Sequence, residues 1–212
     1  MGFKAIIFDW DGVVVDTLQV QAKLYRAIEQ AFHVQFFPQG KTDFKDFFEL
    51  DWKKFYREFG FSDEEVLKIG KYYLEETRKL QSQIKPFPHI PAVLEEASKR
   101  MKVVLLTSNY KDNIIPIMKQ HGIAQYFSYI HDGHNSAIKP DPAVITHTTK
   151  EIGIPPQDCI FVGDMDEEII MAKKAGIGKV IAVTYGFHSL KRLKDTGADA
   201  IVNKPEEILQ HL

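Results

Sequence analysis

The sequence of 212 residues contains only one cysteine, Cys159, and therefore cannot form an internal disulfide bond. Cys159 lies in the apolar run 159–162 with no basic residue beside it, which predicts a buried structural thiol rather than a nucleophile. No apolar run approaches the roughly 20 residues that cross a bilayer, and the first residues have no signal-peptide profile. We expect a cytoplasmic protein that does not bind membranes.

The sequence also has no large excess of positive or negative charge. The chain has 27 Lys and Arg residues against 29 Asp and Glu residues, a formal net charge of -2 at pH 7, and they form no basic cluster. This balance disfavours nucleic-acid binding. The composition, 44% hydrophobic and 26% charged, is typical of a globular protein, and the length suits one α/β domain with a small insertion. No feature of the sequence predicts an oligomeric state.

The most informative stretch is residues 4–17, where an apolar run of strand length ends in two aspartates. Asp9 and Asp11 are two residues apart, so they point to the same side if the extended conformation continues past the strand. Two carboxylates this close favour either a bound cation such as Mg²⁺ or a retained proton, and an enzyme can use both. Gly12 allows a sharp turn and a close approach to a ligand. The alternative is a strand end with two solvated aspartates.

Periodicity predicts the remaining architecture. Apolar and aromatic residues at spacings of three and four indicate helices over 18–32, over the aromatic-rich segment 44–59 and from an N-cap at Ser62 to about Leu80. Prolines 86, 88 and 91 interrupt this pattern. Beyond them, the expected strands are 101–106, 126–131, 159–162, 179–183 and 200–202, and the expected helices are 91–100, 112–122, 141–153, 166–176 and 189–197. This alternation predicts an α/β fold with a doubly wound, mostly parallel sheet.

Ligands of such sheets bind beyond the carboxyl ends of the strands, and three further segments place polar groups there. They are Thr107-Ser108-Asn109, Lys139-Pro140-Asp141-Pro142, and Gly163-Asp164 with the acidic residues 166–168. Each group also has a plainer interpretation: Asp164 as a helix cap, Lys139 as an exposed loop lysine, Thr107 as a strand-end hydroxyl and Asn109 as a turn former.

With these segments in this order, the sequence resembles the haloacid dehalogenase-like superfamily, and within it the phosphoglycolate-phosphatase-like branch with a helical cap. The first motif is similar to residues 8–13, the second to 105–109, the third to 139–142 and the fourth to Gly163-Asp164 with Glu168. The resemblance covers nearly the whole chain. It implies a Rossmann-like core domain formed by residues 1–17 and 85–212 and an inserted helical cap domain formed by residues 18–84.

The resemblance also implies an activity, a Mg²⁺-dependent phosphatase that hydrolyses a small phosphorylated metabolite, either phosphoglycolate-like or a sugar phosphate. Asp9 is then the nucleophile that forms an aspartyl-phosphate, and Asp11 is the general acid and base. The Asp9 carboxylate, the Asp11 backbone carbonyl and the Asp164 carboxylate are the implied Mg²⁺ ligands. Lys139 is the catalytic cation that binds the transferring group.

The substrate-binding residues implied by the same resemblance are Thr107, Ser108, Asn109 and Gly12. Two residues depart from the usual fourth motif. Glu168 stands where an aspartate is common and acts either through a water or by orienting Lys139, with Asp166 and Glu167 as alternatives, and Met165 replaces a small hydroxyl residue.

Two other functions stay open at this point. One is a phosphomutase on a sugar phosphate, like β-phosphoglucomutase, and the other is a binding or regulatory protein that keeps the fold without turnover. Hydrolytic dehalogenation is disfavoured, because that branch of the superfamily has no acid/base aspartate at the position of Asp11. The cap sets specificity in this superfamily, and its sequence gives no substrate signature.

Overall fold

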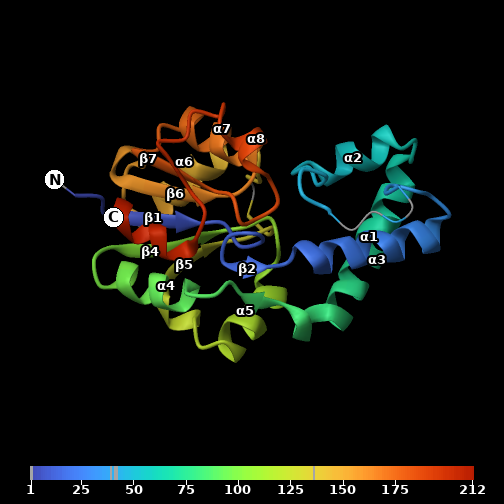
Figure 1. Ribbon diagram of the computed structural model, residues 1–212, viewed down its shortest axis with the longest axis horizontal. Helices are drawn as coiled ribbons and strands as arrows, with labels where there is room; N and C mark the ends of the chain where they lie inside the picture. The colour runs from blue at the N-terminus through green and yellow to red at the C-terminus, as the bar shows by residue number, and fades with distance from the viewer. Residues whose placement is uncertain (1, 39, 41–42, 136) are drawn as a thin grey trace.

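The computed structural model describes residues 2–38, 40, 43–135 and 137–212. Its centre is a six-stranded sheet of strand order β5-β4-β1-β6-β7-β8, in which every neighbouring pair is parallel. The strands are β1 (Ala5–Phe8), β4 (Lys102–Leu106), β5 (Phe127–His131), β6 (Cys159–Gly163), β7 (Lys179–Val183) and β8 (Ala200–Val202). The chain ends lie on the side of this core away from helices α1 to α3 (Figure 1).

Helices cover both faces of the sheet, as expected for a doubly wound fold (Figure 1). One face packs on α4 (Ile90–Ser98) and α5 (Lys111–Gln120), and the other on α6 (Ala143–Ile152), α7 (Asp166–Lys174) and α8 (Leu190–Leu193). Ile6 and Phe8 of β1 belong to the first apolar cluster, whereas Ala5 and Ile7 belong to the second. Because both faces are buried, the strand is a continuous apolar run rather than an alternating one. The predicted fold class is confirmed.

Three helices stand apart from this core: α1 (Leu18–Phe32), α2 (Trp52–Glu58) and α3 (Asp63–Leu80). They are inserted between β2 (Val15–Asp16) and β3 (Lys85–Pro86), which pair antiparallel, so the chain leaves and re-enters the core at one point (Figure 1). The three helices share a third apolar cluster, rich in aromatic side chains. Met165 and Phe187 of the core extend that cluster, which ties it to the sheet edge.

Several element boundaries differ from those expected from the sequence. The segment 44–59 is helical only in α2, because the Asp51 side chain accepts a hydrogen bond from the Lys54 amide at 3.0 Å and so starts the helix at Trp52. The helix expected over 189–197 stops at Leu193, whose carbonyl accepts from the Thr196 hydroxyl at 2.6 Å. Short 3₁₀ helices not expected from the sequence lie at Gln81–Gln83, Ala124–Tyr126, Pro156–Asp158 and Pro205–His211.

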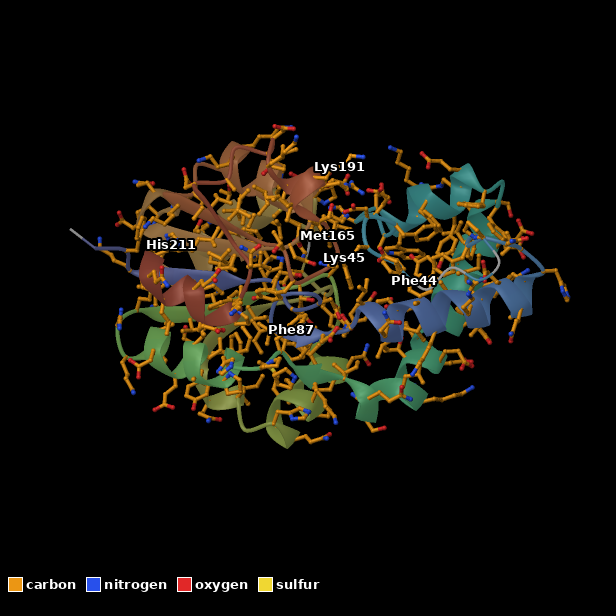
Figure 2. The ribbon with its side chains drawn as sticks, viewed as in Figure 1. Phe44, Lys45, Phe87, Met165, Lys191 and His211 are labelled. Carbon is orange, nitrogen blue, oxygen red and sulfur yellow. The ribbon has the colours of Figure 1, made fainter. Side chains whose placement is uncertain are left out.

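The non-helical residues 43–50 bind the core through backbone and side-chain hydrogen bonds. The Asp46 carboxylate accepts from the Ser189 amide at 2.7 Å and from the Ser189 hydroxyl at 2.6 Å. Lys45 donates to the Thr184 carbonyl at 2.5 Å. Figure 2 labels Lys45 close to Met165 of the core, and Phe44 nearer the inserted helices. The segment leaves the helical conformation because its polar groups are satisfied by the core instead.

Two core side chains, His188 and Arg192, complete the junction. Nδ1 of buried His188 accepts from the Asp166 amide at 3.1 Å, so Nε2 carries the proton and donates to the Phe48 carbonyl at 3.0 Å. Arg192 binds both oxygens of Asp166, at 2.8 and 3.0 Å, and both oxygens of Glu49, at 3.0 and 3.1 Å. One guanidinium therefore bridges the core and the inserted segment.

Two expectations can be compared with the structure: a buried structural cysteine and the absence of a membrane-spanning segment. Cys159 is fully buried, and burial raises the pKa of its thiol to about 11, which suits the structural role. Among the described residues, no helix is both long and apolar enough to cross a bilayer.

Removal of the Arg192 bridge should loosen the junction without unfolding the core. In the Arg192→Ala protein, we expect amide hydrogen exchange in residues 46–50 to accelerate about tenfold, because two charge-assisted pairs are lost. Hydrogen exchange read by mass spectrometry measures this. Lys173→Ala is the matched control, since it removes a partly exposed pair with Asp199 that lies wholly within the core. Equal exchange in residues 46–50 of both variants would contradict the bridging role.

Candidate functional site

The end of β1 carries Asp9 into the middle of the sheet edge. The Asp9 amide donates to the Val162 carbonyl at 3.0 Å, so the backbone stays in register with β6 where the strand ends, and the residue is only 5% exposed. The chain then turns, and the Trp10 carbonyl accepts from the amides of Val14 and Val15, each at 3.0 Å. This turn lets Asp11 line a cavity beside Asp9.

Glycine at position 12 is required by the contact that its backbone makes with Asp164. Gly12 has φ of +81°, and a Cβ atom there would lie 2.1 Å from Oδ2 of Asp164. A Cβ atom on Gly186 would lie 2.2 Å from the same oxygen. The Phe187 amide donates to this oxygen at 2.6 Å. The carboxylate that follows β6 is therefore held between two glycines and a backbone amide.

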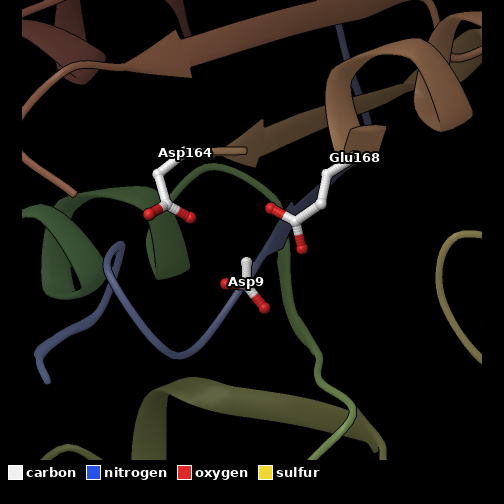
Figure 3. Close-up of side chains that lie close together, drawn as sticks. All are labelled: Asp9, Asp164 and Glu168. Carbon is white, nitrogen blue, oxygen red and sulfur yellow. The ribbon is translucent and has the colours of Figure 1, made fainter. Parts of the chain in front are cut away.

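Three carboxylates meet at this edge of the sheet (Figure 3). Asp9, Asp164 and Glu168 each place one oxygen within 4.8 Å of the others, and all three are buried. Lys139, also buried, donates to Asp9 Oδ1 and to Glu168 Oε1. The lysine that follows β5 in sequence and the glutamate in the first turn of α7 are thus brought together with the aspartate of β1.

The acidic residues that follow Asp164 have separate contacts. Glu168 is the one that binds Lys139. Glu167 accepts from the Leu50 amide at 3.1 Å, and Asp166 binds Arg192. Of the three alternatives left open by the sequence, only Glu168 touches the carboxylate cluster, whereas its two neighbours hold the inserted segment.

Burial of so many like charges shifts their proton affinities. Burial, and after it the charge of Glu168, raises the pKa of Asp9 to about 8 although Lys139 opposes the change. Burial and the charges of Glu168 and Asp9 raise the pKa of Asp164 well above its ordinary value. Burial lowers the pKa of Lys139, but the two carboxylates it binds outweigh this and hold that pKa above its ordinary value. One lysine is therefore too little positive charge for this cluster.

The donor set suits a hard divalent cation. Asp164 Oδ1 and Glu168 Oε2 are buried and have no hydrogen-bond partner among the residues that the structure describes. An unpaired buried carboxylate oxygen is costly, and a cation that takes oxygen ligands removes that cost. The cluster of Asp9, Asp164 and Glu168 can hold a metal ion. The expected ligands were the carboxylates of Asp9 and Asp164 and the backbone carbonyl of Asp11. The cluster in the structure contains these two carboxylates and, in addition, that of Glu168.

The second expected motif follows β4 at the same edge. Thr107 is buried, and its hydroxyl accepts from the Asn109 amide at 3.0 Å. The Asn109 side-chain oxygen accepts from the Tyr110 amide at 2.9 Å and the Asn113 side chain at 3.1 Å, so it fixes the start of α5. Ser108 is exposed. All three expected residues line the cavity that Asp9, Asp11 and Lys139 also line, whereas Gly12 does not.

This cavity lies between the sheet edge and helices α1 to α3, and its volume is about 420 Å³. Its floor is formed by the charged residues at the strand ends, and its remaining wall comes from the inserted segment and from Met165 and Phe187. Burial raises the pKa of Asp11, one of the floor residues, so its carboxyl holds a proton more tightly than in water. The site therefore combines a charged floor that could hold a metal ion with the cavity space above it.

Comparison with known proteins agrees with this geometry. The family model of haloacid dehalogenase-like hydrolases matches residues 6–183, which contain all four motifs. The chain belongs to this hydrolase family. It is accordingly an enzyme of the hydrolase class, as the motifs predict.

Named relatives within the family are phosphatases. A phosphorylated carbohydrates phosphatase from Thermotoga maritima is 26% identical, over 99% of this chain and 98% of its own. A phosphoglycolate phosphatase from Pasteurella multocida is also 26% identical, over 98% of this chain and 97% of its own. The fold of a predicted phosphatase from Clostridium acetobutylicum matches with a TM-score of 0.88, at 24% identity, over 100% of this chain and 98% of that one.

Two residues of the site were missed in the sequence, Gly186 and Phe187. They follow β7, which is another strand of the parallel sheet. Their position at the edge where the four motifs meet is the feature of the sequence that could have indicated them. Nothing in their residue types indicates that a backbone amide binds Asp164. Met165, seen in the sequence only as a departure, is 5% exposed and belongs to the apolar cluster of the inserted helices.

The buried carboxylates predict how stability changes with pH. A raised pKa means that the folded state holds the proton more tightly than the unfolded chain, so the stability it contributes is present at acidic pH and is lost as the pH rises toward the folded-state value. In metal-free buffer, the Asp164→Asn protein should therefore be more stable than the parent near pH 8, by about 1–3 kcal/mol, and should lose this advantage toward about pH 5. Urea unfolding at the two pH values measures the difference.

Asp16→Asn is the control for this series, because Asp16 is an exposed aspartate on β2 and should show no such pH dependence. Addition of a divalent cation should reverse the order of stability, since the ion binds the folded parent and not the variant. An Asp164→Asn protein that is less stable than the parent at both pH values without metal would refute the like-charge argument.

Proposed function

We propose that this chain is a Mg²⁺-dependent phosphatase that hydrolyses a small phosphate monoester through an aspartyl-phosphate on Asp9. The observation that carries the proposal is the buried cluster in which Lys139 binds Asp9 and Glu168 beside Asp164, on the floor of an enclosed cavity. The phosphatase relatives support the same reaction class. The residue roles below follow from this proposal.

Asp9 is the proposed nucleophile. One of its carboxylate oxygens attacks phosphorus, the bond from phosphorus to the alcohol oxygen breaks, and an acyl phosphate remains on Asp9. The Lys139 ion pair supports this role, because the ammonium favours the ionised carboxylate against the burial that favours its proton. The same ammonium offsets the charge of the phosphoryl oxygens as they approach.

Asp11 is the proposed general acid and base. It gives a proton to the leaving alkoxide, and its carboxylate then takes a proton from the water that attacks phosphorus and releases inorganic phosphate. Its raised pKa supports the first of these steps, since a carboxyl must hold its proton near neutral pH in order to donate it. Asp11 lines the cavity beside Asp9, which supports contact with the same substrate.

The proposed cofactor is Mg²⁺, held by the carboxylates of Asp9 and Asp164 and by the backbone carbonyl of Asp11. When bound, the ion offsets the negative charge of these carboxylates and of phosphate oxygens. The unpaired buried oxygen of Asp164 supports this choice of ligand. Glu168 is proposed to orient Lys139, to which it is hydrogen bonded.

Thr107 and Lys139 are the proposed ligands of the phosphoryl group. Thr107 directly follows β4 and Lys139 lies in the connection after β5, and both are buried and line the same cavity, which supports this. Ser108 and Asn109 line the cavity next to them. The Asn109 side-chain oxygen already accepts two hydrogen bonds, so its contribution is proposed to be the shape of the loop.

Residues 18–84 are proposed to act as a cap that closes over the site, while residues 1–17 and 85–212 form the core. Its single connection to the core through β2 and β3 and its mainly internal apolar cluster support a unit that moves against the core, and opening would break the hydrogen bonds of residues 43–50. Closure of such a unit excludes water during phosphoryl transfer. Residues 39, 41 and 42 of the cap lie outside the described part of the chain.

The nucleophile assignment predicts the effect of a single isosteric change. The Asp9→Asn protein should lose Mg²⁺-dependent release of phosphate from an aryl phosphate by on the order of 10⁴-fold or more, with an unchanged fold by circular dichroism. A phosphate-release assay measures this. Asp16→Asn changes a nearby exposed aspartate and should retain full activity. Full activity in the Asp9→Asn protein would exclude the covalent mechanism.

A second measurement separates the phosphatase from the two other functions that the sequence left open. With a hexose 1-phosphate and Mg²⁺, phosphorus NMR should show inorganic phosphate, because the acyl phosphate is proposed to react with water. Accumulation of the 6-phosphate isomer would instead identify a phosphomutase. No turnover of any compound in a broad panel of phosphate monoesters would favour a binding protein.

A further inference from the structure

The wall of the cavity above the carboxylate cluster is mainly aromatic and aliphatic. The inserted helices contribute Tyr25 and Tyr56, which are buried, and Trp52, which is 36% exposed. The indole of Trp52 lies against the backbone of α3, where a Cβ atom on Gly70 would be 3.1 Å from Cη2. The core contributes Met165, which is buried and also packs in the apolar cluster of the inserted helices. Core and cap therefore both present apolar surface to the space above the floor.

Three polar side chains of this wall, Gln21, Tyr73 and Glu49, already have hydrogen-bond partners. The side chains of Gln21 and Tyr73 exchange hydrogen bonds at 2.7 and 2.9 Å. Glu49 is bound by the Arg192 guanidinium at the cap junction. A substrate rich in hydroxyl groups would have to compete with these pairs, and each polar group left unpaired in the cavity costs free energy.

Buried positive charge is confined to the floor. Among the described residues that line the cavity, Lys139 is the one buried cation, and Asp9 and Glu168 already bind it. The other lining lysines, Lys53 and Lys71, are exposed. A second anionic group on the substrate, such as a carboxylate, would therefore enter the wall region without a buried partner, which is unfavourable.

We propose that the substrate is a phosphate monoester whose alcohol carries an aromatic or similarly flat apolar group, seated against Trp52 and Tyr56. The inference rests on the proposed phosphatase activity and adds the class of leaving group. The phosphate occupies the charged floor, and the ring occupies the apolar wall. Burial of the ring supplies the preference, since it removes apolar surface from water.

Substrates with the same leaving-group chemistry test this directly. 2-Phenylethyl phosphate and ethyl phosphate are both primary alkyl esters, so they differ mainly in the ring. We expect kcat/KM for the phenylethyl ester to be about 10- to 100-fold higher, the range that burial of one aromatic side chain gives. It should also exceed kcat/KM for 2-phosphoglycolate. The matching phosphonates cannot be hydrolysed, and calorimetry in the presence of Mg²⁺ should show the same ratio in Kd.

Substitutions in the cavity wall test where the aromatic ring of the substrate binds. The Trp52→Ala protein should lower the ratio of kcat/KM between 2-phenylethyl phosphate and ethyl phosphate about tenfold. Phe59→Ala is the matched control, because Phe59 is 42% exposed in the same cap but does not line the cavity. If the Trp52→Ala protein does not fold, Leu74→Lys adds a cation to the wall. That variant should lower the aromatic preference and raise turnover of 2-phosphoglycolate.

The outcomes distinguish this inference from the proposed function. Equal kcat/KM for the two alkyl esters, a better kcat/KM for 2-phosphoglycolate, or an unchanged preference in both wall variants overturns the aromatic class and leaves the phosphatase standing. No turnover of any ester, with the aromatic phosphonate still bound more tightly, overturns the phosphatase and supports the aromatic site. Turnover with the expected preference supports both.

Discussion

The structure depends on the burial of three carboxylates at one point of the sheet edge. Asp9, Asp164 and Glu168 are each less than 6% exposed, and among the described residues Lys139 is the one buried lysine or arginine. Such a cluster is unfavourable in an apolar environment unless its charges are offset. The parallel sheet makes the cluster unavoidable, since β1 and β6 are neighbours and each is followed directly by an aspartate. The glycines that touch Asp164 let the backbone approach that carboxylate, and the requirement for a cation follows from the same burial.

The fold could be predicted from the sequence because its strands are short apolar runs buried on both faces and its helices have regular apolar spacing. Asp9, Asp164, Thr107 and Lys139 could be located for a related reason: each follows a strand or its connection, and parallel strands end on one edge. The boundaries of α2 and α8 could not be predicted, since local side-chain contacts set them: Asp51 starts α2 and Thr196 binds the carbonyl at which α8 stops. Gly186 and Phe187 were missed because their contribution to the site is a backbone approach and an amide, which no residue type reveals.

Tertiary contacts, and not residue type, decide the roles of the three acidic residues 166–168 that follow β6. Asp166, Glu167 and Glu168 are chemically alike and adjacent, yet α7 directs them to three different partners: a guanidinium, a backbone amide of the cap segment and the lysine of the site. One turn of helix thus joins the floor of the cavity to the junction that holds residues 43–50. A movement of the cap that displaces Glu49 or Leu50 acts on residues next to Glu168. One turn of α7 therefore contacts both Lys139 and residues 49–50 of the inserted segment, the latter directly through Glu167 and through the Arg192 guanidinium.

The two halves of the cavity contribute differently to discrimination among substrates. In the proposed function, the charged floor interacts with the phosphate, which every phosphate monoester carries, so the floor cannot distinguish one ester from another. Discrimination must arise from contacts with the rest of the molecule, and specificity is a difference between such contacts. On the described wall, the residues available for such contacts include Trp52, Tyr56 and Met165, and Gln21 and Tyr73 near them are already paired. Met165 packs in the apolar cluster of the inserted helices, while its neighbour Asp164 belongs to the buried carboxylate cluster.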